Sequence, residues 1–185
     1  MIFPHTVSRR VELRPASMRD HSLFLDTLLR TGLESFRPAA TTAGMFRILD
    51  AAFLVCRRDG EEVLGFSTLH GLDPAGHIRC GIYLDRSRAR LGIGSEAIHL
   101  LLNYAFAMFN VEKVVAQTTE ASFSAFGLTL GGSQIRSVLS DHLYFRGTLW
   151  DLHTFQIERH EWERHVDDNL GNILPEPLTW RSAPV

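Results

Sequence analysis

The segment DRSRARLGIGSEAIHLLLNYAF, Asp85–Phe106, joins a loop with two glycines to a long stretch of helical periodicity. The glycines carry no side chain, so successive backbone N–H groups can converge on an anion at the positive end of a helix. Arg86, Arg88 and Arg90 add positive charge that can pair with phosphate. The segment therefore predicts an anion-binding loop, and the combination favours a diphosphate.

Other interpretations of the loop fit less well. A P-loop would need Gly-Lys-Ser/Thr, which is missing. Gly92-x-Gly94-x-x-Ala97 matches the dinucleotide fingerprint, but that fingerprint begins directly after a strand in a parallel sheet. Here about seven residues separate Leu84 from Gly92, and hairpin signals come first. A surface loop whose glycines only begin a helix remains an alternative.

The composition predicts one soluble domain. The chain has 185 residues, of which 45% are hydrophobic and 22% charged, as is ordinary for a globular protein. This length predicts a single domain over residues 1–185, with a core from about 11 to 162 and a C-terminal tail from 163 to 185. A net charge of −2 gives no basic field that would favour nucleic acid as a partner.

The cysteines and the hydropathy indicate the compartment. Cys56 and Cys80 are isolated, which argues against a disulfide scaffold or a zinc ribbon and favours a reducing compartment. Cys80 alternates with Ile78, Ile82 and Leu84, so we expect a core thiol rather than a nucleophile. No apolar run reaches the roughly 18 residues of a membrane span. We therefore expect a cytoplasmic protein without a membrane partner.

The remaining periodicity predicts alternating strands and helices. Strands are expected at Val11–Ser17, Phe53–Arg58, Val63–Leu72, His77–Asp85 and Lys113–Thr118, with two more in Ser137–Glu158 around a turn at Arg146-Gly147. Helices are expected from Ser17 to Gly32, Thr42 to Ala52, the glycine loop to Asn110, and Thr119 to Leu130. In the third helix the expected apolar face is Ala97, Ile98, Leu101, Leu102, Ala105, Met108 and Phe109. The tail after Glu161 has a mixed pattern. The order predicts a mixed α/β fold with one βαβ crossover between antiparallel parts.

The stretch RARLGIGSEAIHLLLNYAF resembles the pyrophosphate-binding motif of the GNAT superfamily of acyl-CoA N-acyltransferases, Gln/Arg-x-x-Gly-x-Gly/Ala. LRPASMRD resembles the first strand and helix start of that family, EEVLGFSTLHGLD its central hairpin, and NVEKVVAQTTEAS its fifth strand. The segment from Ser137 to Trp162 resembles the closing hairpin of the branch that acetylates ribosomal-protein N-termini and polyamines. The resemblance covers Val11 to Trp162. It implies a mostly antiparallel central sheet, flanked by helices, whose fourth and fifth strands splay apart.

The resemblance also implies how acetyl-CoA binds. Backbone N–H groups of the loop would hold the pyrophosphate, and strand four would pair with pantetheine while one of its N–H groups polarises the acyl carbonyl. The residues concerned are Arg88, Ala89, Arg90, Leu91, Gly92, Ile93, Gly94 and Ser95 in the loop, and Ile82, Tyr83 and Leu84 in strand four. The chain departs from the motif at its first position, where Ala89 replaces glutamine or arginine, and Arg88 is the expected substitute.

The helix after strand five also departs from the family. Thr119 stands where relatives have an asparagine that contacts pantetheine, and Ser122 is its small partner. Ser122 is therefore a candidate for CoA binding and for catalysis. Phe126 or Gly127 occupies the place of a tyrosine that reprotonates the leaving thiolate, and neither can donate a proton. Phe126 is therefore expected only to contact CoA. A thiolate with a pKa near 8.5 needs little help at neutral pH.

Two histidines are candidates for the general base. Many relatives use a glutamate of strand four, but this strand has Arg79 near that place. His70 ends strand three and His77 begins strand four, and an imidazole titrates in the useful range. We expect His70 to be the base because it shares a strand face with Phe66 and Thr68, although both histidines could be exposed turn residues. Glu120 or a backbone-held water would be next.

No metal is expected. HEWERH, His160–His165, resembles the zincin motif His-Glu-x-x-His, but its histidines are five residues apart instead of four. That spacing places them on different faces of a helix.

The predicted function is transfer of acetyl from acetyl-CoA, by direct attack, to a primary amine of a small molecule or a peptide N-terminus. A homodimer is predicted through an apolar end formed by Leu149, Trp150, Phe155, Leu174 and Trp180. The alternatives are an amino-sugar acceptor, another acyl donor, or a CoA-binding module with weak or no turnover.

Overall fold

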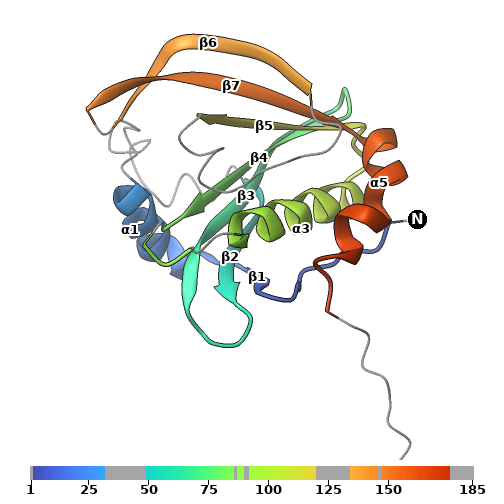
Figure 1. Cartoon of the computed structure of the whole chain (residues 1–185), viewed down its shortest axis with the longest axis horizontal. Coiled ribbons are helices and arrows are strands. Elements are labelled where there is room, and N and C mark those ends of the chain that lie inside the picture. Colours follow the sequence, from blue (N-terminus) through green and yellow to red (C-terminus); the bar gives the residue numbers. More distant parts are fainter. Residues whose placement is uncertain are drawn as a thin grey trace, which may run out of the picture.

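The computed structural model describes residues 2–31, 49–85, 87–89, 92–119, 134–145 and 147–175 (Figure 1). The helix expected at Thr119–Leu130 lies outside these residues after position 119, and so does the part of the second expected helix at 42–48.

A seven-stranded sheet forms the body of the protein, with the strand order β1-β2-β3-β4-β5-β7-β6. Its strands are β1 Val11–Pro15, β2 Leu49–Arg57, β3 Val63–Asp73, β4 His77–Leu84, β5 Lys113–Thr119, β6 Gln134–Phe145 and β7 Thr148–Glu158. Neighbouring strands are antiparallel except for β4 and β5, which are parallel. The mixed α/β fold with one central crossover is therefore confirmed.

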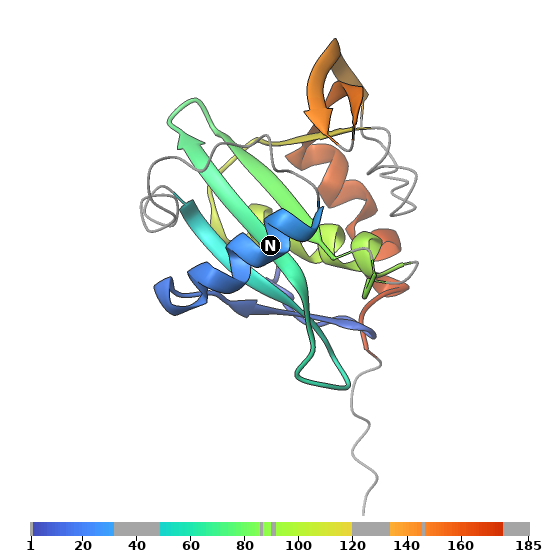
Figure 2. The same ribbon diagram turned by 90° about the vertical axis from the view of Figure 1, so that its left-hand side faces the viewer.

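Helices cover both faces of the sheet. They are the short 3-10 helix η1 Met18–Asp20, α1 His21–Thr31, α3 Ile93–Met108 and α5 Arg159–Gly171. Figure 2 shows α1 in front of the strands and α3 behind them. The predicted helix start at Ser17 is confirmed, because Ser17 and Asp20 form a capping box: the Asp20 carboxylate accepts a 2.7 Å hydrogen bond from the Ser17 N–H.

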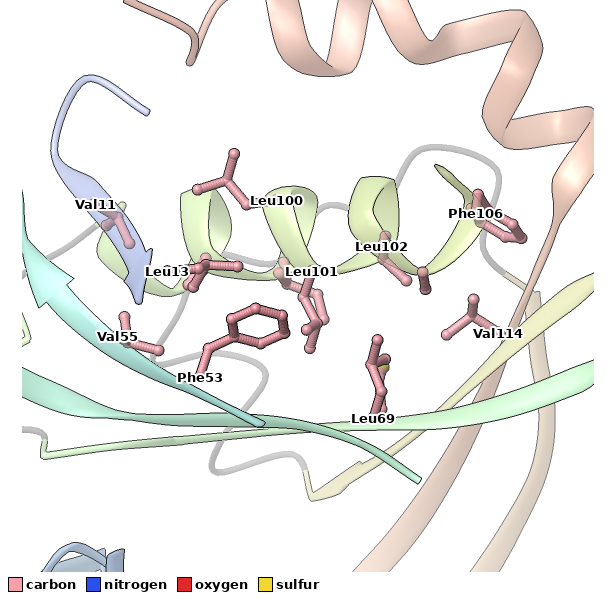
Figure 3. Close-up of a cluster of buried hydrophobic side chains, with 14 of the residues drawn as sticks. Val11, Leu13, Phe53, Val55, Leu69, Leu100, Leu101, Leu102, Phe106 and Val114 are labelled. Atoms are coloured by element: carbon pink, nitrogen blue, oxygen red, sulfur yellow. The ribbon is translucent and has the colours of Figure 1, made fainter. Parts of the chain in front are cut away.

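Helix α3 is the centre of the core. Its leucines at 100, 101 and 102 are completely buried. Leu101 and Leu102 lie on the side of the helix that faces the strands, whereas Leu100 points away from them (Figure 3). The predicted single apolar face was too narrow, because Leu100 and Phe106 are buried as well, whereas Met108 is 55% exposed and Phe109 lies beyond the helix. The reason is that α5 also covers α3, with Trp162 stacked on Phe106.

Two further expectations from local spacing were wrong or incomplete. The helix expected to reach Ala52 is replaced by β2 from Leu49 onward, because Ala51 and its neighbours pair with the end of β3. Strand pairing there overrides the helical spacing.

The mixed tail contains helix α5, which buries Trp162 and Leu170 on one face. Trp162, Val166 and Leu170 follow one another at intervals of four, a helical signal that the sequence carries.

Gly65 sets how closely β3 approaches the end of β4. A Cβ atom at this position would lie 2.0 Å from the Tyr83 carbonyl oxygen and 2.9 Å from the Leu84 Cα. We predict that Gly65→Ala lowers the free energy of unfolding by about 2 kcal/mol or more, since backbone cannot yield as a side chain does. Urea unfolding followed by circular dichroism measures the change. Gly171→Ala, where a Cβ meets nothing within 4 Å, is the matched control and should change stability little.

Candidate active site

Strands β4 and β5 separate halfway along their length. Their parallel pairing runs from His77–Lys113 to Cys80–Ala116, which covers the first four of the eight residues of β4. β4 then continues to Leu84 while β5 stays paired with β7 as far as Thr119. Figure 1 shows the two strands diverging. One backbone edge of β4 beyond Cys80 therefore has no strand partner among the described residues, and an extended ligand can pair with it.

The glycine loop lies directly after the separated end of β4. Gly92 is the N-cap of α3 and has φ +89°, a left-handed conformation that favours glycine. It offers no side-chain cap, and its carbonyl accepts the Glu96 N–H at 3.0 Å. The first N–H groups of a helix lack partners within the helix. The start of α3 can therefore receive an anion beside the opening between β4 and β5.

The predicted CoA-binding residues differ in burial. Leu84 and Ile93 are 2% exposed and belong to the core, so they can contribute only backbone to a ligand. Ala89 packs against the same core, while the exposed Arg88 forms a 3.6 Å ion pair with Asp85. Gly94 is buried in the first turn of α3, and Ser95 and Ile82 are half-buried. Thr119 ends β5, and Arg90, Leu91, Ser122 and Phe126 lie outside the described residues.

His70 lies near the point where β4 and β5 separate. It is half-buried and faces Arg79 across the β3–β4 pair, one residue before the β4–β5 pairing ends. Its Nδ1 atom is buried and has no hydrogen-bond partner among the described residues. Burial lowers the pKa of His70 below its ordinary value, and the charge of Arg79 lowers it further, against an opposing effect of Asp50. The imidazole is therefore neutral at pH 7 and can accept a proton.

The face that carries His70 also carries a tyrosine hydroxyl beyond the last β4–β5 pair. Phe66 pairs with Tyr83, and Thr68 with Gly81, two residues apart along each strand and therefore on one face of the sheet. The side chains of Thr68 and Tyr83 are hydrogen-bonded, and burial raises the pKa of the Tyr83 phenol. A Cβ at Gly81 would lie 2.9 Å from the Tyr83 hydroxyl, so the glycine lets the ring fold back over β4. From the sequence, a role was predicted only for the backbone of Tyr83.

The described residues contain no group of three or more His, Cys, Asp or Glu side chains that could hold a metal ion. His165 of the histidine-containing segment instead contacts the Glu161 carbonyl within its own helix.

Cys80 is a core thiol, as predicted, and burial raises its pKa to about 12. In the described part of the chain no helix is long and apolar enough to cross a membrane.

A family model described as an acetyltransferase (GNAT) domain matches residues 10–122. The chain therefore belongs to the GNAT acetyltransferase family, and it is an acyl-CoA-dependent N-acetyltransferase. No curated protein matches the sequence.

Solved structures share the fold at low sequence identity. Spermidine N-acetyltransferase from Vibrio cholerae, in complex with CoA and spermine, is 15% identical with a TM-score of 0.65, over 83% of this chain and 98% of that one. RimL, a ribosomal alpha-N-protein acetyltransferase in complex with coenzyme A, is 16% identical with a TM-score of 0.64, over 87% and 99%. A GCN5-related N-acetyltransferase from Brucella melitensis is 20% identical with a TM-score of 0.62, over 97% and 91%.

A carboxylate in the loop should weaken anion binding. We predict that Gly92→Asp weakens CoA binding at least about tenfold, because it places a negative charge and a Cβ at the start of α3. Isothermal titration calorimetry with CoA measures the affinity. Gly60→Asp, in an exposed turn without a close contact, is the control for the added charge. Parental affinity in Gly92→Asp would show that the loop does not hold CoA.

Proposed function

We propose that this chain transfers acetyl from acetyl-CoA to a primary amine of a small molecule or a peptide N-terminus. The observation that carries the proposal is the separation of β4 from β5 directly before the Gly92 loop. The loop is suited to the diphosphate of CoA, and the open edge of β4 to its pantetheine arm. The acyl group then lies between the strands, on the side where an amine can approach.

The reaction proposed is a direct attack. The amine nitrogen forms a bond to the acyl carbon, the carbonyl oxygen gains negative charge, and a β4 N–H stabilises that charge. The carbon–sulfur bond then breaks and CoA leaves as a thiolate, which takes up a proton. Cys80 is too deeply buried to act as a nucleophile, with 6% of its surface exposed. The proposed reaction therefore proceeds without a covalent intermediate on this residue.

We infer that His70 removes the proton from the amine, directly or through a water. An alkyl ammonium with a pKa of about 10 must lose its proton before it can attack, at a cost of roughly 4 kcal/mol at pH 7. A neutral imidazole at the strand separation can accept that proton. The half-buried site and the nearby Arg79 both keep His70 neutral.

His70→Ala tests this role. We predict that turnover falls about 10²- to 10⁴-fold at saturating acetyl-CoA, with CoA affinity unchanged. In the parent, kcat/KM should fall as pH decreases through the lowered pKa of His70, so the midpoint of the acidic limb lies below 6.5. The variant should lose this limb. His77→Ala is the control and should keep the acidic limb. His77 lies on the other side of the turn, with its Nε2 atom 3.7 Å from the Asp73 Oδ2.

The acceptor class rests on the names of the structural neighbours. One neighbour acts on spermidine and another on a ribosomal protein N-terminus. Thiol release from acetyl-CoA, measured with spermidine, a peptide with a free N-terminus and an amino sugar, tests the class. Steady release with one of the first two supports the proposal. Tight CoA binding without release with any amine would instead indicate a CoA-binding module.

We also propose a homodimer through the edge strand β6. Val138, Leu139, Tyr144 and Leu149 are between 44% and 59% exposed on the β6–β7 hairpin, which projects from the body in Figure 2. This set replaces most of the surface expected from the sequence. Phe155 is only 6% exposed, Trp150 and Leu174 are half-buried, and Trp180 lies outside the described residues. Exposed apolar groups on an edge strand favour pairing with a second copy.

Light scattering at tens of micromolar should give the mass of a dimer. We predict that Leu139→Lys converts it to a monomer, because a charge on the edge strand opposes pairing. Leu72→Lys is the matched control, since Leu72 is equally exposed at 46% but lies on β3. A monomer mass for the parent would refute the proposal.

A cytoplasmic location is also proposed. Both cysteines of the chain are free and buried, as is common in proteins of a reducing compartment.

A further inference from the structure

A buried carboxylate lies in the first turn of α3, next to the proposed CoA loop. Glu96 is 2% exposed. Its Oε2 accepts hydrogen bonds from the Ser8 hydroxyl at 2.6 Å and the Arg10 N–H at 3.1 Å. Its Oε1 accepts from the Arg10 Nε at 2.6 Å. A negative charge here would repel a diphosphate, and the adjacent guanidinium neutralises it.

The same guanidinium reaches the glycine loop. A Cβ atom built on Gly92 would lie 2.5 Å from both Nη1 and Nη2 of Arg10. The terminal nitrogens of Arg10 therefore occupy the space above Gly92, while its Nε is bound to Glu96. The Arg10 side chain is 54% exposed, so the guanidinium lies at the surface of the loop and not beneath it.

The loop motif itself supplies no cation at its first position. The first position of the loop motif is Ala89, which has no charge, and Arg88 is engaged with Asp85. Arg57 of β2 donates a hydrogen bond from Nη2 to the Arg88 carbonyl at 3.3 Å. This contact holds the backbone of the loop and leaves its first motif position uncharged. Arg10 is thus a cation at Gly92 itself, supplied by a segment more than eighty residues earlier in the chain.

We propose that Arg10 contacts the CoA diphosphate and replaces the basic residue that the loop motif lacks, with Glu96 and Ser8 setting its orientation. A guanidinium has five N–H donors, so an ion pair through Nε is compatible with a phosphate contact. The inference rests on the proposed function, because it assumes that the loop binds CoA. It assigns the cation to a residue outside the motif.

A comparison of two variants tests the inference. Arg10→Ala alone leaves a buried, unpaired carboxylate that can destabilise the fold. Arg10→Ala is therefore made together with Glu96→Gln and compared with Glu96→Gln alone. Calorimetry with CoA gives the affinity, and steady-state assays give KM for acetyl-CoA and for S-acetylpantetheine, which lacks the diphosphate. Arg9→Ala is the matched control, because this neighbouring arginine contacts the Leu174 carbonyl instead of the loop.

The expected result is CoA affinity about tenfold or more lower in the double variant than in Glu96→Gln, from loss of a charged contact. KM for S-acetylpantetheine should stay the same in these two variants. Equal CoA affinity in the double variant and in Glu96→Gln would overturn the inference. If the parent still binds CoA in that case, the proposed function stands. An equal loss with both donors would also overturn it, because Arg10 would then act only on the fold. A parent that fails to bind CoA would overturn both.

Discussion

The candidate site depends on the short backbone pairing between β4 and β5. The two strands pair through four residue pairs and then separate. Both strands are held on their outer sides, β4 by β3 and β5 by β7, so the opening between them does not weaken the rest of the sheet. A single crossover helix, α3, joins the two strands, and its first turn faces the open end. The same separation therefore provides an extended backbone edge and leaves the start of α3, where we propose that an anion binds, beside the opening.

The burial of α3 makes this arrangement rigid. Leucines on several sides of the helix are fully buried, because the sheet covers one side and α5 another. Such a helix cannot shift without opening the core, so its N-terminus keeps a fixed position relative to β4. Glu96 adds a polar constraint at the same end, since it ties the segment before β1 to the first turn of α3 through three hydrogen bonds.

Electrostatics divide the site into two halves. At the loop, positive charge from Arg10 and the helix terminus favours a phosphate group. Near the strand separation, Arg79 and partial burial lower the pKa of His70 and favour its neutral form. In the proposed function these two settings serve two different substrates, because the diphosphate of CoA needs positive charge whereas the attacking amine needs a proton acceptor.

The sequence alone determined the order of the seven strands, the crossover around α3 and the glycine loop, because these follow from local periodicity and from residue types such as Gly92. It also determined that Cys80 is a core residue, through its strand alternation. Only the tertiary structure decided that β2 begins at Leu49, that Phe155 is buried, and that Arg10 lies over the loop. Each of these depends on contacts between segments distant in the chain. Hydrophobic periodicity shows which side of a single helix or strand is apolar. Strand pairing and the partner of a buried charge depend instead on which distant segments the fold brings together.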